Sequence, residues 1–329
     1  MPGKLPKLDL NITNRCNFRC THCAFNSGIK EIDELSLEEL EKILRETKEL
    51  GGQRIDVTGG EPTIRQDYKE IIKTAKKMDY KVELITNASL IDEKSIAELR
   101  EIGLDQIAVS IDGSDYATHA RIRRVDKDTY RKLLEITRNI SDSGFYTKVN
   151  TVVFSSNMHD MANISNLAEE LGAKEHGIYY FTPVGRGESS KELSAEPLSW
   201  LNYIRNKLAD KKIKLSVEVP IIEEDSELQT CCIAESKPYH FQILPDGSTY
   251  PCAIMSHYSK EFGNLRTCSI KQLWNNEGIW RSYWKDSMEP LFKKYSSCVD
   301  YSASFDINKY KNYRFVCPLR KYSVGELLG

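Results

Sequence analysis

The sequence predicts an α/β protein: an incomplete (β/α)6 barrel followed by a smaller α+β domain. Three observations support this prediction. Six short β-type runs alternate with five stretches whose apolar residues recur three and four positions apart, and the sequence changes character near residue 222. Repeated βα units form a parallel sheet, and their right-handed crossovers curl it toward a barrel.

The six strands are predicted from apolar runs rich in β-forming residues, at 8–13, 54–58, 81–86, 106–111, 146–154 and 177–182. Helices are predicted between them, at 36–50, 66–78, 92–102, 127–140 and 158–171. The first helix begins with a capping box, Ser36 with Glu39. Ligands collect at the carboxyl ends of the strands in such a sheet, so the residues that follow each run are candidates for a site.

A second domain is predicted from residue 223 to residue 329, after a core of residues 1–222. A further helix near 197–209 and the strand KIKLSVEV lead to an acidic stretch, IIEEDSEL, which is predicted as the linker. The hairpin-like segment FQILPDGSTYPC follows, then an aromatic-rich segment and scattered cysteines. We expect these elements to form the smaller domain.

The composition is that of an ordinary soluble protein, with 40% hydrophobic residues, 29% charged residues and a net charge of -2. It excludes a nucleic-acid polyanion as the main partner. No signal peptide or membrane span is recognisable, so we expect a cytoplasmic protein. Nine cysteines in a reducing compartment indicate metal binding rather than disulfides.

Three of these cysteines, Cys16, Cys20 and Cys23, lie on the loop after the first predicted strand, in the pattern C-x3-C-x2-C. Three thiolates can hold three irons of a 4Fe-4S cubane and leave the fourth iron open for another ligand. A ferredoxin site or a structural zinc site needs a fourth ligand, and no fourth cysteine lies nearby. Zinc, or thiols of the core, remain the alternative interpretations.

This pattern after the first strand of a partial barrel resembles the radical S-adenosylmethionine (SAM) superfamily, whose members have a partial TIM-like barrel. The resemblance begins at Leu8 and continues to Phe181 and beyond. It implies that the open iron binds SAM and that reductive cleavage of SAM gives a 5'-deoxyadenosyl radical, which abstracts hydrogen from a substrate. His22 stands where the family usually has an aromatic residue, and Ala120 where it usually has an aspartate.

The resemblance also implies a set of SAM-binding residues at the ends of the later strands. Gly59, Gly60 and Glu61 match the family's GGEP motif, and Arg123 matches the arginine that pairs with the SAM carboxylate. Short polar residues complete the set, because strand ends face the ligand in this fold. The predicted cofactor-binding residues are Gly59, Gly60, Glu61, Asn87, Ser110, Asp112, Arg123 and Asn150. Arg186 or Glu188, after the sixth strand, could face the substrate.

The C-terminal cysteines resemble the SPASM and Twitch extensions of radical SAM enzymes, which bind auxiliary 4Fe-4S clusters. We expect one auxiliary cluster, held by Cys232, Cys252, Cys298 and Cys317, as in the shorter Twitch version. A structural zinc is the alternative, because four thiolates also suit tetrahedral zinc. Cys231 and Cys268 are left over, and we interpret them as small buried residues. A role as metal ligand or hydrogen donor is the alternative.

The sequence therefore predicts a radical SAM enzyme that modifies a peptide or protein, with an external electron donor of the flavodoxin or ferredoxin type. Modification of a small molecule, such as a cofactor or tetrapyrrole precursor, is the alternative. A non-catalytic iron-sulfur electron carrier is a third interpretation. It would need fully ligated clusters, and the triad of three cysteines argues against it.

Overall fold

A computed structural model of the chain describes residues 4–28, 32–191, 194–223, 240–253, 255–283, 285–286, 313–315, 321–323 and 327. Cys231, Cys232, Cys298 and Cys317 lie outside these described residues. Three of the four predicted auxiliary-cluster ligands are therefore not placed, and of this set only Cys252 is described.

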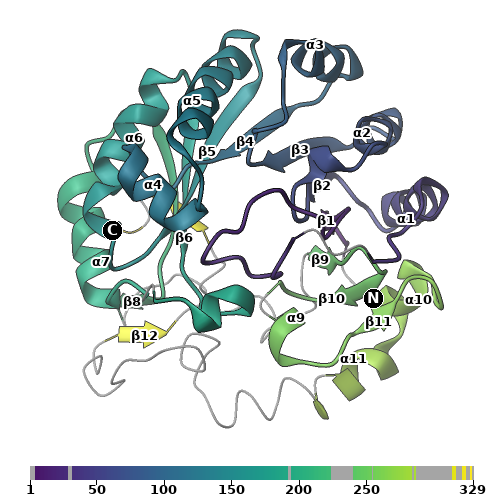
Figure 1. Cartoon of the computed structure of the whole chain (residues 1–329). Coiled ribbons are helices and arrows are strands. Elements are labelled where there is room, and N and C mark those ends of the chain that lie inside the picture. Colours follow the sequence, from purple (N-terminus) through teal and green to yellow (C-terminus); the bar gives the residue numbers. More distant parts are fainter. Residues whose placement is uncertain are drawn as a thin grey trace.

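Seven parallel strands form the centre of the fold, and each one pairs with the next along the chain. They are β1 (Lys7–Asn11), β2 (Arg54–Thr58), β3 (Lys81–Thr86), β4 (Gln106–Ser110), β5 (Tyr146–Val153), β6 (Glu175–Tyr180) and β7 (Lys214–Glu218). The sheet is curved but open, as Figure 1 shows, and its edge strands are not paired to each other. The predicted partial barrel is confirmed, and the run KIKLSVEV supplies a seventh parallel strand, β7.

Most of the helices cover the outer face of this sheet (Figure 1). They are α1 (Leu37–Glu49), α2 (Tyr68–Lys77), α3 (Glu93–Ile102), α5 (Lys127–Asp142), α6 (Met161–Glu170) and α7 (Pro197–Tyr203). Helix α4 (Tyr116–Arg123) lies instead at the carboxyl ends of the strands, against the loop that follows β1. The predicted capping box of Ser36 and Glu39 begins α1. Helix α4 was not predicted, because it buries only His119 and Ile122 and lacks a regular apolar stripe.

The C-terminal hairpin continues the barrel sheet. Strand β9 (His240–Ile243) pairs in parallel with β1, and β10 (Ser248–Tyr250) and β11 (Gly263–Asn264) follow it in antiparallel order. Helices α9 (Met255–Tyr258), α10 (Ile270–Asn275) and α11 (Glu277–Tyr283) accompany this hairpin (Figure 1). The hairpin expected in a separate domain is thus bonded to the first barrel strand.

Three short strands complete the described chain. Strand β8 (Ile221–Glu223) pairs with β12 (Tyr313–Phe315), and β13 (Lys321–Ser323) pairs antiparallel with β7. The predicted domain boundary between residues 222 and 223 falls inside β8. Residues 224–239 are not described, so this boundary stays a prediction.

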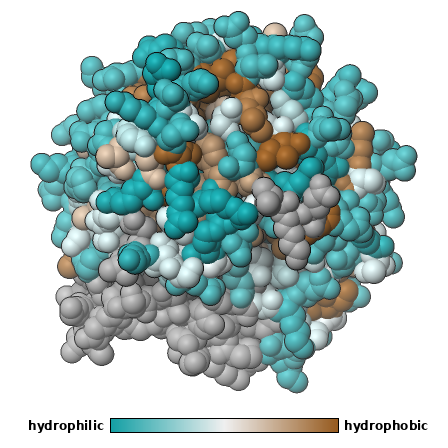
Figure 2. Space-filling view, in the orientation of Figure 1, coloured by the Kyte–Doolittle hydropathy of each residue, from teal (hydrophilic) through white to brown (hydrophobic). Residues whose placement is uncertain are grey.

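The two faces of the barrel strands differ in chemistry. Ile55 and Val57 of β2 belong to the apolar core between sheet and helices, whereas Arg54 and Asp56 alternate with them and face the inside of the barrel. Figure 2 shows a largely hydrophilic surface in which hydrophobic side chains gather toward the middle of the visible face. Within the described residues, no helix has the length and apolar character needed to cross a membrane.

Candidate functional site

A cavity of about 300 Å³ opens at the carboxyl ends of the parallel strands, beneath the loop that follows β1. This loop, drawn in purple in Figure 1, lies across the middle of the open barrel. The cavity wall combines the three cysteines of the loop with polar residues from the ends of β2, β3 and β4 and with side chains of β5 and β6. The place predicted for the site, at the carboxyl ends of the strands, therefore holds a cavity.

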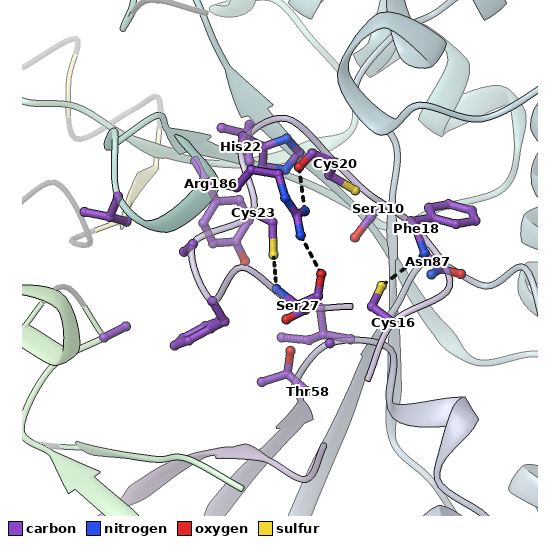
Figure 3. Close-up of a pocket in the computed structure, with 18 of the residues that line it drawn as sticks. Cys16, Phe18, Cys20, His22, Cys23, Ser27, Thr58, Asn87, Ser110 and Arg186 are labelled. Atoms are coloured by element: carbon purple, nitrogen blue, oxygen red, sulfur yellow. Dashed lines mark hydrogen bonds between the residues drawn. The ribbon is translucent and has the colours of Figure 1, made fainter. Parts of the chain in front are cut away.

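Cys16, Cys20 and Cys23 all line this cavity, and Figure 3 shows their sulfurs arranged around it. Backbone bonds hold the loop in this form: the Cys16 N–H donates to the Gly28 carbonyl at 2.7 Å and the Thr21 N–H to the Ile122 carbonyl at 2.9 Å. The first bond thus joins the two ends of the loop, and the second joins the middle of the loop to α4. The structure brings together the three thiols that the spacing predicted.

The arrangement of these thiols fits a cluster better than a single ion. Among the described residues, no three Cys, His, Asp or Glu side chains are close enough to hold one metal ion between them. A cubane is ligated differently, because each thiolate binds its own iron at a separate corner. Burial raises the pKa of the Cys16 thiol to about 12 in the metal-free chain. A bound metal would stabilise the thiolate form of such a buried thiol.

The predicted GGEP motif forms the turn after β2. Gly59 has φ +144°, and a Cβ there would lie 2.4 Å from the Thr13 carbonyl oxygen. A Cβ on Gly60 would lie 2.2 Å from the Arg15 carbonyl oxygen. Both positions need glycine, because the turn packs against the backbone of the cysteine loop. Both glycines line the cavity.

Glu61 is buried beside the cavity rather than among the residues of its wall. One carboxylate oxygen accepts from the hydroxyls of Thr63 and Thr86, each at 2.6 Å, and the other accepts from the Asn87 N–H at 2.7 Å. Burial raises the pKa of this carboxyl, although the hydrogen bonds oppose the rise. As the structure stands, Glu61 joins the end of β2 to the end of β3, and its predicted contact with SAM stays a prediction.

The other polar predictions divide into two groups. Asn87 and Ser110 line the cavity, and the Asn87 side chain donates to Asn17 of the cysteine loop at 2.9 Å. Asn150 is not part of the cavity wall, although it lies opposite Ser110 and Gly177 in the sheet. Its buried Oδ1 has no hydrogen-bond partner among the described residues. An orphaned acceptor of this kind is what an incoming donor group would satisfy.

Arg123 lines the cavity and is held by Asp112, which is not part of the cavity wall. Its Nε donates to Asp112 Oδ2 at 2.5 Å, and its Nη1 lies 3.9 Å from the Cys20 sulfur. Burial opposes ionisation of Asp112, but the Arg123 charge holds its pKa below the usual value. Asp112 also accepts from the Val152 N–H, so it fixes the guanidinium relative to the end of β5.

His22 replaces an aromatic residue in this wall and keeps an aromatic contact. Its ring packs edge-on against Phe154, with centroids 5.5 Å apart. Burial lowers the pKa of His22 to about 4, despite the nearby Asp112 carboxylate. Its Nδ1 is buried without a hydrogen-bond partner among the described residues. The wall therefore presents a neutral imidazole with an unused polar atom, which suits a polar ligand.

Sequence reasoning missed several residues of the cavity wall. Tyr179 and Phe181, at the end of β6, looked like core residues of an apolar strand, and Phe18 and Phe25 of the cysteine loop carried no motif. His257 of α9 comes from the C-terminal extension, and its ring centroid lies 5.7 Å from that of Phe25. Only the alternation along β6 could have marked Tyr179 as facing inward.

Fold and site together define a class: a partial (β/α) barrel with three cysteines on the loop after its first strand, at a cavity beside the strand ends. Comparison with family models makes this specific. Residues 10–168 match the radical SAM superfamily, and residues 231–300 match an iron-sulfur cluster-binding domain named SPASM. The chain belongs to the radical SAM superfamily and carries a SPASM domain. It is an enzyme that uses SAM and a 4Fe-4S cluster, with auxiliary iron-sulfur binding in the SPASM domain.

Curated relatives span most of the chain. An AdoMet-dependent heme synthase of Methanosarcina barkeri is 26% identical over 82% of this chain and 82% of its own length. A PqqA peptide cyclase of Bradyrhizobium diazoefficiens is 26% identical over 83% of this chain and 74% of its own length. The family models thus confirm the predicted superfamily and an iron-sulfur extension, and the shorter Twitch version with one cluster stays a prediction.

Solved structures confirm the fold. Streptococcus suis SuiB bound to SAM superposes with a TM-score of 0.70 at 15% identity, over 85% of this chain and 67% of SuiB. The protein anSMEcpe with bound AdoMet superposes with a TM-score of 0.62 at 20% identity, over 84% of this chain and 82% of its own. At these identities the likeness concerns the fold alone.

Proposed function

We propose that this enzyme holds its catalytic cluster through Cys16, Cys20 and Cys23 and binds SAM against the strand ends that line the same cavity. The observation that carries the proposal is that three sulfurs, two close-approach glycines and a carboxylate-held arginine meet at one cavity. The SAM-contacting set is Gly59, Gly60, Asn87, Ser110 and Arg123, with Glu61, Asp112 and Asn150 beside them.

When bound, the cluster and SAM supply a 5'-deoxyadenosyl radical that abstracts hydrogen from the substrate. The chain's own residues bind SAM, orient it and exclude water from the cavity. Asp112 fixes the Arg123 guanidinium, which is the natural partner of a carboxylate in this wall. Val152 and Phe181 provide an apolar side of the cavity, and such a surface keeps water from a reactive centre.

A peptide or protein is the proposed substrate. Two similar proteins support it: one is named a PqqA peptide cyclase, and SuiB was solved bound to the precursor peptide SuiA. The cavity wall includes Ala253 and His257 of the C-terminal extension, so a substrate side chain there would contact barrel and extension together. We infer that the electron for SAM cleavage comes from an external donor of the flavodoxin or ferredoxin type.

Modification of a tetrapyrrole is the second candidate. It is favoured by two relatives from Methanosarcina barkeri, the heme synthase and an Fe-coproporphyrin III synthase that is 26% identical over 83% of this chain. The aromatic residues of the cavity, among them Phe18, Tyr179 and Phe181, suit a flat conjugated ligand as well as an aromatic peptide side chain.

The cluster assignment is tested with a single substitution. Reconstituted Cys20→Ala, incubated with dithionite and SAM, should form no 5'-deoxyadenosine, because two remaining thiolates anchor too few irons. Cys268→Ala is the matched control, since Cys268 is a partly buried thiol that hydrogen-bonds the Asn264 carbonyl near β11. Wild-type levels of 5'-deoxyadenosine in Cys20→Ala would remove the assignment.

The substrate class is tested by hydrogen transfer. Reduced enzyme and SAM are incubated in parallel with Fe-coproporphyrin III and with synthetic, deuterated peptides encoded by short reading frames beside its gene. We expect a peptide to raise 5'-deoxyadenosine formation and to transfer deuterium into it. Stimulation by the tetrapyrrole alone would replace the peptide proposal with the second candidate.

A further inference from the structure

The loop after β6 holds the cysteine loop from the opposite side of the cavity. It comprises residues 182–189 and includes the 3-10 turn Gly185–Ser189, and Thr182, Val184 and Arg186 from it line the cavity. More than 150 residues of chain separate it from the triad, yet Arg186 contacts the triad loop directly (Figure 3). The sequence predicts either that Arg186 or Glu188 faces the substrate or that this loop is a glycine-rich connection. The Arg186 guanidinium lines the cavity and bonds the cysteine loop, and its contact with a substrate stays a prediction.

Arg186 donates to three carbonyls of the cysteine loop. Its Nη1 donates to the Cys20 carbonyl at 2.9 Å and its Nη2 to the Ser27 carbonyl at 2.6 Å. Its backbone N–H donates to the Cys23 carbonyl at 3.0 Å. These acceptors belong to the second cysteine, the third cysteine and the end of the loop. Arg186 therefore fixes the distance between the two halves of the cysteine loop.

The neighbouring glycine makes this approach possible. Gly185 has φ +57°, and a Cβ there would lie 1.9 Å from the Ala24 carbonyl oxygen. Any side chain would push the two loops apart. The sequence Gly185-Arg186 thus combines a residue that allows contact between the loops with a residue that holds them together.

A guanidinium is suited to this contact in a way that other cations are not. It is planar, and its donors form a rigid fork that can bond two carbonyls in a fixed geometry, whereas a lysine ammonium is a point charge on a flexible stem. The positive charge also lies beside the triad, because the guanidinium bonds the carbonyl group of Cys20 itself. A fixed cation stabilises added negative charge nearby.

We propose that Arg186 is a positioning residue that sets the shape of the cysteine loop before metal binds and raises the reduction potential of the cluster held there. The inference deepens the proposed function, since it takes Cys16, Cys20 and Cys23 as the cluster ligands. Its first part concerns the protein chain alone. It can therefore fail or hold independently of the cluster assignment.

Two substitutions separate geometry from charge. Arg186→Lys keeps the charge and loses the fork, and Arg186→Gln loses both. In the metal-free full-length chain, hydrogen exchange of residues 16–28 should become about tenfold faster in both variants, because charge-assisted bonds across the loop are lost. In reconstituted protein, iron release to a chelator should accelerate about tenfold in both. Arg138→Gln is the control, an exposed arginine on α5.

The charge is read from a redox titration of the SAM-sensitive spectroscopic signal. Its midpoint potential should fall in Arg186→Gln and stay close to wild type in Arg186→Lys. An unchanged potential in Arg186→Gln would overturn the electrostatic part. An unchanged rate of hydrogen exchange in residues 16–28 of both variants would overturn the positioning part. Equally accelerated exchange in the strands of the sheet would also overturn it, because the effect would then be global.

A glycine pair gives a test that leaves the arginine intact. Gly185→Ala should also speed exchange in residues 23–28, since its methyl group meets the Ala24 carbonyl. Gly103→Ala is the control: Gly103 has φ +80° at the end of α3, but its nearest neighbour, a Lys76 side-chain atom, is 4.0 Å from the added Cβ. Exchange of the cysteine loop as slow as wild type in Gly185→Ala would contradict the close contact of the two loops.

Discussion

Arg123 shows how one side chain connects the parts of the candidate SAM site. Its guanidinium lies between the Asp112 carboxylate and the Cys20 sulfur; Asp112 is buried, and the Arg123 side chain is 12% exposed. A buried arginine without its carboxylate would be costly, so Asp112 offsets the burial and also fixes its direction. Glu61 is similarly satisfied, by donors from Thr63, Thr86 and Asn87.

Alanine at Arg123 should weaken SAM binding by about 1.5 to 3 kcal/mol, the range for a hydrogen bond to a charged group, while the iron content stays unchanged. Equilibrium dialysis with labelled SAM measures the affinity. Arg121→Ala is the matched control, because Arg121 is an exposed arginine of the same helix. Glu61→Ala should also weaken binding. Unaltered affinity in both the Arg123 and Glu61 variants would show that SAM binds elsewhere.

At the scale of the strands, ionic side chains line the inside of the barrel. Lys7 pairs with Asp56 at 2.7 Å, and Arg54 pairs with Asp56 at 2.7 Å and with Glu83. The series continues through Lys148, 3.4 Å from Glu83 and 3.2 Å from Glu175, to Lys214. Charges of alternating sign thus join strands β1, β2, β3, β5, β6 and β7. Apolar side chains therefore pack between the sheet and the helices, whereas ion pairs line the inner face of the open sheet.

Glu175 gives this network a pH signature. Burial opposes its ionisation, but Lys148 and hydrogen bonds from Lys214 and Ser216 lower the pKa of Glu175 from 4.5 to about 2. A carboxyl whose folded pKa is depressed contributes stability above its unfolded pKa, and this contribution is lost as the pH falls toward the folded value. The relevant window is therefore about pH 4.5 down to about pH 2.

Glu175→Gln should lower the free energy of unfolding by about 1 to 3 kcal/mol at neutral pH, because Lys148 loses a charged partner. The difference from wild type should shrink as the pH falls through the window above. Urea unfolding of the metal-free protein across this range measures it. Glu135→Gln, on the exposed face of α5, should have no such effect. A pH-independent difference would mean that the charge of Glu175 does not stabilise the fold.

At the scale of the whole molecule, the C-terminal extension is part of the wall of the candidate SAM cavity. Strand β9 bonds to β1, the chain turns through β10, and Cys252 follows it, buried. The next residue, Ala253, already lines the cavity, as does His257. An auxiliary cluster ligated by Cys252 would therefore be anchored within one residue of the cavity wall.

Metal analysis tests the number of clusters. If Cys232, Cys252, Cys298 and Cys317 bind one auxiliary cubane, the anaerobically purified chain holds about eight irons, and the triple alanine variant of Cys16, Cys20 and Cys23 retains about four irons and four sulfides. SAM should perturb only the N-terminal signal, because four thiolates leave no open iron. One zinc and no sulfide in the triple variant would replace the auxiliary cluster by a structural zinc.

The sequence by itself determined the alternation of strands and helices, the three-cysteine loop after the first strand and the polar residues at strand ends, because each follows from spacing along the chain. Only the tertiary structure placed β9 beside β1, turned Arg186 toward the Cys20 and Ser27 carbonyls, and surrounded Glu61 with donors from β3. These contacts join residues distant in sequence, and many use backbone carbonyls and N–H groups, which every residue type carries. No residue pattern encodes them, so they depend on the path of the folded chain.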